Sequence, residues 1–347
     1  MADIVPLSRP VSAKPTDKTS AAPRRARPAS SAARMGDQVY SAITFLASLS
    51  IFAIIVWLVW QLTGASLLSI HRSGWSFVTG SNWDEVANIY QAKPYIFGTL
   101  YSSAIALILS VPVSVGAAIF LSELAPRWIR TPATFLIELL AAIPSVVYGL
   151  WGIFILIPFL KAFVFKPVIN SPLPHLKFIG GLFVSQSTGY SMLAAGVILA
   201  IMITPFITAV TRDILRAIPK AQREGSYALG ATQWESIGRV VIPYAKSGII
   251  GAVILGLGRA LGETMAVAML IGNQSPNTPS GISFSLFESG YTMSSAIANK
   301  FNEATPGSLN QSALVEVGLV LFVVTVVVNI LARLLVFYTA KDVQGGK

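Results

Sequence analysis

The sequence contains six stretches of predominantly apolar residues, and each is long enough to cross a lipid bilayer as a helix. A spanning helix needs about 20 such residues. Chains of this kind bury their apolar side chains in lipid rather than in a water-soluble core. We therefore predict an all-α integral membrane protein with six transmembrane helices, at about 39–63, 95–122, 132–160, 190–211, 248–272 and 313–338.

The composition agrees with a membrane protein. The mean hydropathy is +0.67, and only 12% of the residues are charged, against about 25% in an average soluble domain. The chain has no cysteine, which excludes a disulfide framework, a thiolate metal site and a cysteine nucleophile. Its two histidines, His71 and His175, are too few and too far apart for a metal-ligand cluster. We expect neither a metal nor a cofactor.

Residues 1–34 differ from the rest of the chain. They are rich in Pro, Ala, Ser and Arg and show no apolar periodicity, so they cannot bury enough surface to fold. We predict a disordered basic tail, followed by a membrane domain over 38–342. The apolar stretch after the tail has full spanning length, which favours a retained first helix over a cleaved signal peptide. Retention on the cytoplasmic face explains the positive charge, and no nucleic-acid partner is expected.

The distribution of charge gives the orientation. An even number of spans puts both termini on one side. That side also receives the connection after the second span and the one at 213–247, and together these segments hold most of the 25 Lys and Arg residues. The positive-inside rule makes this face cytoplasmic. The opposite face has longer connections at about 64–94, 161–189 and 273–312, which either join helices or receive an extracytoplasmic binding protein.

Two charged residues lie within the fifth apolar stretch. Arg259 and Glu263 are four residues apart, so a continuous helix would place them on one face, about one turn apart. Charge at this depth is costly and usually marks a substrate path. The planar donors of Arg259 match two oxygens of an oxyanion. Glu263 is expected to hold the guanidinium or to accept a hydrogen bond from a substrate that carries a proton, as phosphate does at neutral pH and sulfate does not.

The alternative for this pair is structural: Arg259 and Glu263 neutralise each other and hold neighbouring helices together. Gly258 and Gly262 form a GxxxG step beside the pair, which suits a close approach of helices in a membrane. Two further acidic residues, Glu123 and Glu138, are interpreted as interfacial or helix–helix contacts. A bare carboxylate beside a doubly charged anion would repel it.

The segment EGSYALGATQWESIGRVVIP, at 224–243, lies in the 213–247 connection. Small residues let a short helix approach another surface closely, and rigid aromatic side chains are effective anchors at interfaces. The segment therefore fits a helix that docks in a partner's groove, although packing on its own bundle is the alternative. The residues expected to serve coupling to a partner are Glu224, Gly225, Ser226, Tyr227, Gly230, Trp234 and Pro243.

This segment resembles the "EAA" coupling loop of ABC importer permeases. The blocks LSELAP (121–126), LLAAIPSVVYGLWG (139–152) and GLGRALGETMAVAMLIGN (256–273) resemble the PstC permease family of phosphate ABC importers, and they follow in that family's order. The resemblance runs from about residue 38 to the C-terminus. It implies a type I ABC importer permease (MetI-like) fold, in a bacterial cell membrane, and import of inorganic phosphate. The tail lies outside it, and the loop reads Glu-Gly-Ser where the motif has Glu-Ala-Ala.

The resemblance also implies partners. No GxxxxGK[ST] segment occurs in the sequence, so the chain lacks the usual phosphate-binding loop for ATP, and we expect a permease rather than an enzyme. The implied complex contains a second, PstA-like permease, a dimer of PstB-like ATPases and an extracytoplasmic PstS-like phosphate-binding protein. Membrane lipid is a further expected partner of this chain. ATP-driven closure of the ATPases would rock the bundle between outward and inward openings.

Other functions are compatible with parts of the sequence. An ABC permease for sulfate or molybdate would share the fold and the ATPase, and only the blocks at 139–152 and 256–273 argue against it. An ion-coupled secondary transporter would need coupling residues and often shows inverted repeats with broken helices, and it would leave the coupling loop unexplained. A membrane anchor or scaffold would not need an arginine within a span.

Overall fold

A computed structural model of the chain describes residues 31–176, 180–183, 188–274 and 282–344. The chain divides into two units, Met1–Trp57 and Leu58–Lys347, and each is described by itself. Most of the predicted tail, residues 1–30, lies outside the described residues. Residues 31–34, which the prediction also placed in the tail, belong to the first turns of a helix.

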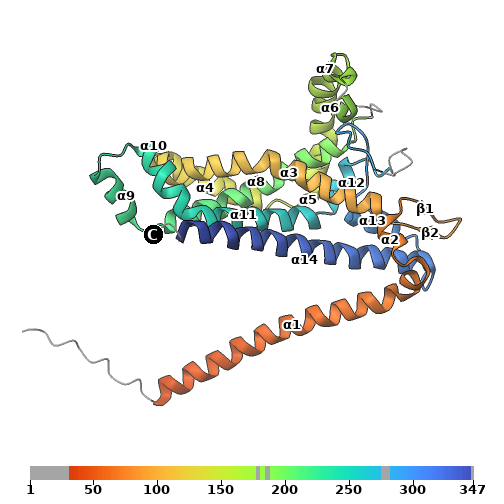
Figure 1. Ribbon diagram of the computed structural model, residues 1–347, viewed down its shortest axis with the longest axis horizontal. Helices are drawn as coiled ribbons and strands as arrows, with labels where there is room; N and C mark the ends of the chain where they lie inside the picture. The colour runs from red at the N-terminus through yellow and green to blue at the C-terminus, as the bar shows by residue number, and fades with distance from the viewer. Residues whose placement is uncertain (1–30, 177–179, 184–187, 275–281, 345–347) are drawn as a thin grey trace, which may run out of the picture. The chain divides into compact units, whose positions relative to one another are not determined.

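The described residues are almost entirely helical (Figure 1). The α-helices are α1 (Ser31–Ser73), α2 (Ser76–Thr79), α3 (Lys93–Ile119), α4 (Arg127–Ala141), α5 (Ser145–Trp151), α6 (Ile157–Leu160), α7 (Lys166–Ile169), α8 (Met192–Ala217), α9 (Lys220–Ala228), α10 (Gln233–Ser236), α11 (Ile242–Gly262), α12 (Met265–Leu270), α13 (Met293–Lys300) and α14 (Leu309–Gln344). Strands β1 (Trp83–Asp84) and β2 (Ile89–Tyr90) form an antiparallel hairpin.

Shorter helical segments connect several of these elements. Four π-helical segments, Phe120–Leu124, Gly152–Leu156, Lys161–Phe165 and Ile237–Val241, continue α3, α5, α6 and α10 without a break. Two 3₁₀ turns, Leu173–His175 and Gly180–Phe183, follow α7. Figure 1 shows α6 and α7 rising at a steep angle from the direction shared by α3 and α8.

Six helices in the described part of the chain are long and apolar enough to cross a membrane, which confirms the predicted number. They cover Gly36–Ser73, Lys93–Leu124, Ser145–Ile169, Met192–Ala217, Gln233–Gly262 and Leu309–Leu334. The second, fourth and sixth start and end within about six residues of the predicted spans, whereas the first continues ten residues beyond its predicted end at 63. The third and the fifth differ.

The third predicted span, 132–160, contains a break. Helix α4 ends at Ala141, and a new helix begins after Pro144, whose ψ of 138° is extended. Proline lacks a backbone N–H and disfavours a helical residue before it. Pro144 therefore separates two helices instead of kinking one. The candidate span starts only at Ser145 and runs on to Ile169.

The fifth predicted span, 248–272, is also interrupted. Helix α11 ends at Gly262, Glu263 is extended with a ψ of 127°, and α12 starts at Met265. Backbone groups freed inside a membrane must find other partners. Here the Ser294 hydroxyl of α13 donates to the Glu263 carbonyl oxygen at 2.7 Å, and the Ala268 N–H donates to the Thr264 carbonyl oxygen at 2.9 Å. The break is thus a hydrogen-bonded part of the structure.

Helix α1 belongs to both units. In the first unit its large apolar side chains from Val39 to Trp57 are exposed, as suits a helix surrounded by lipid or by another chain. In the second unit, its last turns bury Ser66 and Ser69. The Ser69 N–H donates to the Ser312 hydroxyl of α14 at 3.2 Å, and that hydroxyl donates to the Ala65 carbonyl oxygen at 2.9 Å. These bonds join the end of α1 to the start of α14.

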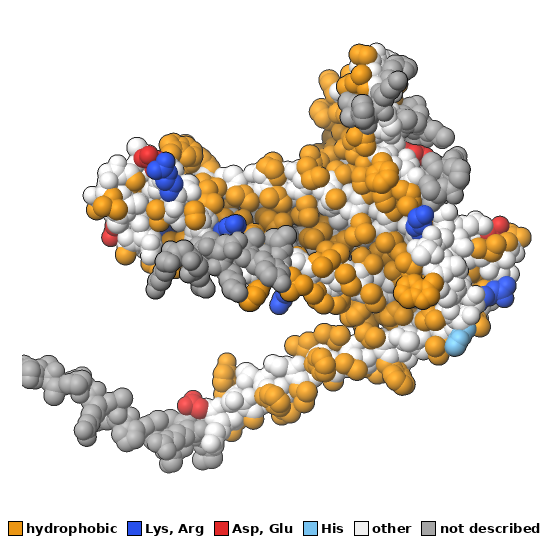
Figure 2. Space-filling view, viewed as in Figure 1, with side chains coloured by type: hydrophobic (Ala, Val, Ile, Leu, Met, Phe, Trp, Pro, Cys, Tyr) orange, Lys and Arg blue, Asp and Glu red, His pale blue; other side chains and the backbone are white. Residues whose placement is uncertain are grey.

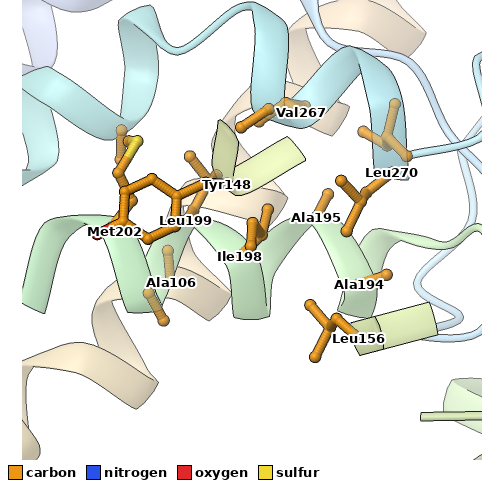
Figure 3. Packing of buried hydrophobic residues seen from close by; sticks show 14 of the residues in the cluster. Ala106, Tyr148, Leu156, Ala194, Ala195, Ile198, Leu199, Met202, Val267 and Leu270 are labelled. Carbon is orange, nitrogen blue, oxygen red and sulfur yellow. The ribbon is translucent and has the colours of Figure 1, made fainter. Parts of the chain in front are cut away.

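The largest core cluster of the second unit surrounds α8. Ile198, Leu199 and Ile203 of α8 are fully buried, and side chains of α3, α5 and α12 cover them (Figure 3). Glycines allow the close approach of α5 to α12, because a Cβ on Gly149 would lie 2.4 Å from the Met269 sulfur. In contrast, hydrophobic side chains cover much of the outer face over α3 and α14, where charged residues are sparse (Figure 2).

A small polar and aromatic domain lies beside one end of the spans. Trp83 packs edge-on against Tyr90 across the β1–β2 hairpin, with ring centroids 5.0 Å apart. Lys300 of α13 donates to a Glu85 carboxylate oxygen at 2.7 Å and also faces the Trp83 ring. The hydrogen bond from Lys300 lowers the pKa of Glu85 below its usual value, although partial burial acts in the opposite direction. The hairpin is therefore held to α13 by one ion pair and an aromatic contact.

We expect Gly98→Ala to destabilise the protein, because a Cβ at Gly98 would lie 1.9 Å from the Tyr291 carbonyl oxygen. Forcing an extra methyl group into such a contact costs about 1–3 kcal/mol. Gly116→Ala on the same helix is the matched control, since a Cβ there meets no atom within 4 Å and alanine favours a helix. Thermal unfolding of the purified variants measures both. Equal midpoints for the two variants would contradict the close approach of α3 to Tyr291.

We expect Glu85→Gln to lower stability at pH 7 by no more than about 1 kcal/mol, as for other partly exposed ion pairs. Because the folded-state pKa of Glu85 is lowered, the ion pair stabilises the protein above the unfolded-state pKa, and this contribution is lost as the pH falls through the folded-state pKa. The difference between wild type and variant should thus disappear well below pH 4.5. Thermal unfolding of both proteins across this pH range tests it, and a difference that persists in acid would argue against the ion pair.

Candidate functional site

Arg259 lies in the last turn of α11, and its side chain is exposed. Its guanidinium carbon stands 5.9 Å from the centre of the Phe206 ring on α8, a distance at which a cation is attracted to the ring face. A cation near a helix C-terminus is also stabilised by the helix dipole. The structure thus presents Arg259 on the surface of α11, supported by an aromatic ring of α8.

Glu263 does not occupy the position that a continuous helix predicts. Because α11 ends at Gly262, Arg259 and Glu263 do not lie one turn apart on one helix face, and this part of the prediction is wrong. One Glu263 carboxylate oxygen accepts a hydrogen bond from the Ala266 N–H at 3.3 Å. The Glu263 side chain is half-buried at the break and stabilises the start of α12 instead of extending α11.

Arg259 and Glu263 do not pair with each other. In the described ranges the ion pairs within 4.0 Å involve other residues, and Arg259 donates no hydrogen bond to any described group. The alternative in which Arg259 and Glu263 neutralise each other therefore does not hold in this conformation. Arg259 keeps its full set of donors for a ligand or for another chain.

The predicted GxxxG approach is also absent within this chain. A Cβ on Gly262 would meet nothing within 4 Å, and one on Gly258 would only reach Asn329 of α14 at 3.9 Å. The close contacts of α11 are made by Gly248 and Gly256, where a Cβ would lie 2.6 Å from Ile214 and Ile207 of α8. The glycines beside Arg259 thus leave open space around it.

Arg212 forms a second charged cluster on α8, which the sequence analysis missed. Its side chain is only 5% exposed, and its guanidinium binds Asp213 at 2.8 Å and Glu138 of α4 at 3.2 Å. Glu138 is therefore a helix–helix contact, as predicted. The sequence around Arg212 gives no signal for its partner, because Glu138 lies on another helix.

The coupling segment forms two short helices joined by a defined turn. Gly230 has a φ of +82°, and the N–H groups of Gly230 and Ala231 donate to the carbonyl oxygens of Tyr227 and Ser226. This is the hydrogen-bond pattern of a Schellman C-cap, which favours glycine at this position. Thr232 and Glu235 then form a capping box that starts α10. The sequence thus specifies both the end of α9 and the start of α10.

Ser226 holds the two helices together. It is buried, and its hydroxyl lies 2.7 Å from that of Ser236, while it also donates to the Arg223 carbonyl oxygen at 2.8 Å. A larger residue at Ser226 would separate α9 from α10. Among the predicted coupling residues, Ser226 therefore has an internal structural role.

The other predicted coupling residues face outward or lie beside α9. Glu224 and Gly225 are exposed, and a Cβ on Gly225 would meet nothing within 4 Å. Pro243 lies in the first turn of α11, where its missing N–H costs nothing. Figure 1 shows α9 and α10 at one end of the bundle, away from the β1–β2 hairpin.

Three large apolar side chains on this segment are exposed: Tyr227 by 45%, Leu229 by 91% and Trp234 by 68%. We call them the apolar patch. Tyr227 and Trp234 were predicted as anchors, whereas Leu229 was not.

A buried ion pair attaches α9 to the membrane helices. Two nitrogens of the Arg223 guanidinium donate to the two carboxylate oxygens of Glu123, at 3.1 and 2.7 Å. Arg223 also donates to the carbonyl oxygens of Leu215 and Ile218 at the end of α8. Gln233 donates to the Glu123 carbonyl oxygen at 3.0 Å. A bidentate arginine–carboxylate pair of this kind is strong and directional.

No group of three or more His, Cys, Asp or Glu side chains suited to a metal ion occurs among the residues that the structure describes. The candidate site is therefore the pair of features on α11 and α9: a free arginine at the helix break, and an exposed apolar patch attached to α8 and α3.

Comparison with solved structures supports the fold. The chain resembles the bacterial ABC transporter involved in the import of the acidic polysaccharide alginate, with a TM-score of 0.55 over 88% of this chain and 99% of that chain, at 15% identity. A bacterial alginate ABC transporter in complex with an alginate pentasaccharide-bound periplasmic protein gives a TM-score of 0.52 over 83% of this chain and 92% of that chain, at 15% identity. At this identity the likeness concerns the fold, which is that of an ABC importer permease.

Sequence comparison gives the family. Residues 110–341 match the family model of the binding-protein-dependent transport system inner membrane component. The chain is 44% identical to the phosphate transport system permease protein PstC of Haemophilus influenzae, over 86% of this chain and 93% of that protein. It is 45% identical to the protein of the same name from Pasteurella multocida, over 84% and 90%. The chain therefore belongs to the PstC family of binding-protein-dependent inner membrane permeases.

Proposed function

We propose that this chain is a transmembrane permease subunit of an ATP-driven importer that moves inorganic phosphate into the cytoplasm. The observation that carries the proposal is Arg259, in a chain of the PstC family: its guanidinium is exposed on an apolar helix and forms no ion pair with any residue that the structure describes. An isolated charge in a span is costly unless it serves a substrate or a partner. An oxyanion is the substrate that best offsets the cost of this charge, because pairs of its oxygens match the arginine donors.

The Glu263 carboxylate favours phosphate over sulfate as the substrate. Only one of its carboxylate oxygens accepts the Ala266 N–H, so the other remains available as an acceptor near the helix break. Phosphate at neutral pH retains a proton that it can donate to such an oxygen, and sulfate does not. A site with Arg259 as donor and Glu263 as acceptor would therefore distinguish the two anions, since a buried acceptor without a donor is penalised.

The apolar patch is proposed as the contact with a separate ATPase. Large apolar side chains this exposed are costly on a water-facing segment, and aromatic anchors dominate interface energies. Gly225 leaves room beside the patch for a partner's backbone. The partner would be a PstB-like ATPase dimer in the cytoplasm, with a PstA-like second permease completing the path and a PstS-like binding protein delivering phosphate outside.

The proposed topology follows from the placement of the patch. The apolar patch and both chain termini belong on the cytoplasmic side, where ATP is available and where the positive-inside rule puts most of the basic residues. The hairpin of β1 and β2 and helix α13 then face outward, toward the binding protein.

The helix break at Glu263 is relevant to the main alternative function, an ion-coupled secondary transporter. Broken helices near a substrate site are also typical of ion-coupled secondary transporters, so the break does not discriminate by itself. Family membership and the apolar patch favour the ABC importer. A permease for sulfate or molybdate shares both features, and only substrate selectivity separates it from the proposed function.

We expect Arg259→Ala to lower phosphate uptake about 10- to 100-fold, because a charge-assisted contact contributes about 1.5–3 kcal/mol. Arg259→Lys should recover part of the activity, since it keeps the charge and loses the planar fork. The measurement is uptake of labelled phosphate, with labelled sulfate alongside, into liposomes that hold the assembled importer with ATP and the binding protein. Arg72→Ala, another exposed arginine, is the control.

Phosphate uptake by the wild-type complex in the absence of ATP would contradict the proposed ABC importer. Uptake of sulfate as fast as phosphate would mean that the importer accepts a broader range of oxyanions than phosphate alone. Normal uptake by Arg259→Ala, with the complex assembled, would remove Arg259 from the substrate path.

We expect Leu229→Ser and Trp234→Ala each to reduce the amount of ATPase that co-purifies with the permease pair by about tenfold or more, because truncating a central interface anchor costs at least about 2 kcal/mol. Both side chains are exposed, so the fold should be unaffected. Val86→Ser is the matched control, because Val86 is 93% exposed but lies beside the β1–β2 hairpin. If the patch variants retain as much ATPase as the control, α9 and α10 are not the docking surface.

A further inference from the structure

We propose that a groove between α8, α11 and α14 binds one anionic phospholipid, with Arg333 holding the phosphate headgroup and the apolar walls holding an acyl chain. The groove has a volume of about 400 Å³, within the range of small-molecule sites. Its principal lining residues are Val210 and Ile214 of α8, Gly251 and Leu255 of α11, and Arg333 and Val336 of α14.

The floor and the walls of the groove are apolar. Helices α8 and α11 touch where Ile214 packs over Gly248, which closes the groove on one side. At Gly251, by contrast, a Cβ would meet nothing within 4 Å. Leu255 is 56% exposed one turn further along α11. The missing side chain at Gly251 thus creates the space, and the surrounding aliphatic groups favour a hydrocarbon occupant.

Arg333 is the one charged residue among the described groove-lining residues. It is exposed, and no described group accepts a hydrogen bond from it or pairs with it. It lies in the C-terminal part of α14 (Leu309–Gln344), toward the end that the proposed topology places at the cytoplasmic face. Long arginine side chains near the end of a membrane helix extend to the lipid headgroups and leave their apolar stems in the hydrocarbon region.

The arrangement fits an amphiphile better than a free anion. Inorganic phosphate in this groove would meet one cation and no other donor, and the apolar walls would strip its water at a high cost. A phospholipid avoids that cost, because its phosphate stays at the hydrated surface while its chain enters the groove. Basic side chains at the membrane surface attract anionic lipids in particular, and basic pockets between transmembrane helices bind their headgroups.

The site is separate from Arg259. Arg259 and Phe206 do not line the groove, and its lining on α11 ends at Leu255, one turn before Arg259. Lipid binding here therefore does not depend on the proposed transport of phosphate, and the two can be tested independently.

The test is native mass spectrometry of the assembled, delipidated importer, titrated with phosphatidylglycerol or with phosphatidylcholine of the same acyl chains. Wild type should retain one phosphatidylglycerol more tightly than phosphatidylcholine. Arg333→Gln should lower that affinity about fivefold or more, consistent with one basic contact at a membrane surface. Arg216→Gln is the matched control, because Arg216 is an exposed arginine near the same end of α8 and does not line the groove.

A second variant tests the apolar part. Gly251→Leu should fill the groove without a clash, since a Cβ at Gly251 has no neighbour within 4 Å, and it should weaken binding of both lipids while Arg333 is intact. Co-purification of all subunits shows that each variant assembles.

Three results would overturn the proposal. The first is equal phosphatidylglycerol affinity in wild type and Arg333→Gln. The second is displacement of the lipid by inorganic phosphate at millimolar concentration, which would make Arg333 a site for the free anion. The third is no retained lipid in the wild-type complex, which would mean that another helix of the assembly covers the groove.

Discussion

The packing of α3 against α8 supports the rest of the second unit. In a membrane, apolar burial gives little net drive for helices to associate, so small residues and hydroxyl groups must hold them together. Gly196 of α8 receives Ile105 of α3, where an added Cβ would lie 2.4 Å from an Ile105 methyl carbon. Ser114 donates to the Thr204 carbonyl oxygen, and Thr208 donates to the Ser114 carbonyl oxygen. Because these contacts fix the axis of α8, its Phe206 ring lies beside Arg259 and its Ile214 packs against α11.

The break at Glu263 divides one apolar segment into two helices that make different packing contacts. Helix α11 before the break packs on α8 through Gly248 and Gly256, and α12 after it packs on α5 in the core. Among the described residues, Arg259 contacts the Phe206 ring but has no ion-pair or hydrogen-bond partner for its guanidinium. An arginine at the end of a supported helix, with its donors free, is an arrangement that a second chain or a ligand must complete, which agrees with a subunit that works in a heteromeric complex.

The sequence predicts the spans better than it predicts how they are interrupted. Their number follows from apolar length, which the bilayer imposes. Pro144 signals a disturbance, but a kink and a full break have the same local sequence, and only the packing of α4 and α5 selects the break. Nothing comparable marks the end of α11, because the residues after Gly262 suit a helix. The position of Glu263 was therefore mispredicted from its spacing to Arg259, whereas the turn at Gly230 was readable from its residue types.

The contacts of Arg223 were not predictable for a related reason, and they connect the two candidate functional features. Arg223 on α9 binds Glu123 at the end of the second span and two carbonyl oxygens at the end of α8. These are the two helices whose packing holds the second unit together. A partner that pulls on the exposed face of α9 would transmit that force to both helix ends at once, because breaking a bidentate pair that is mostly buried is costly. Since α8 also carries the ring that supports Arg259, a movement of its axis relative to α11 would change the surroundings of that guanidinium without any direct contact between α9 and Arg259.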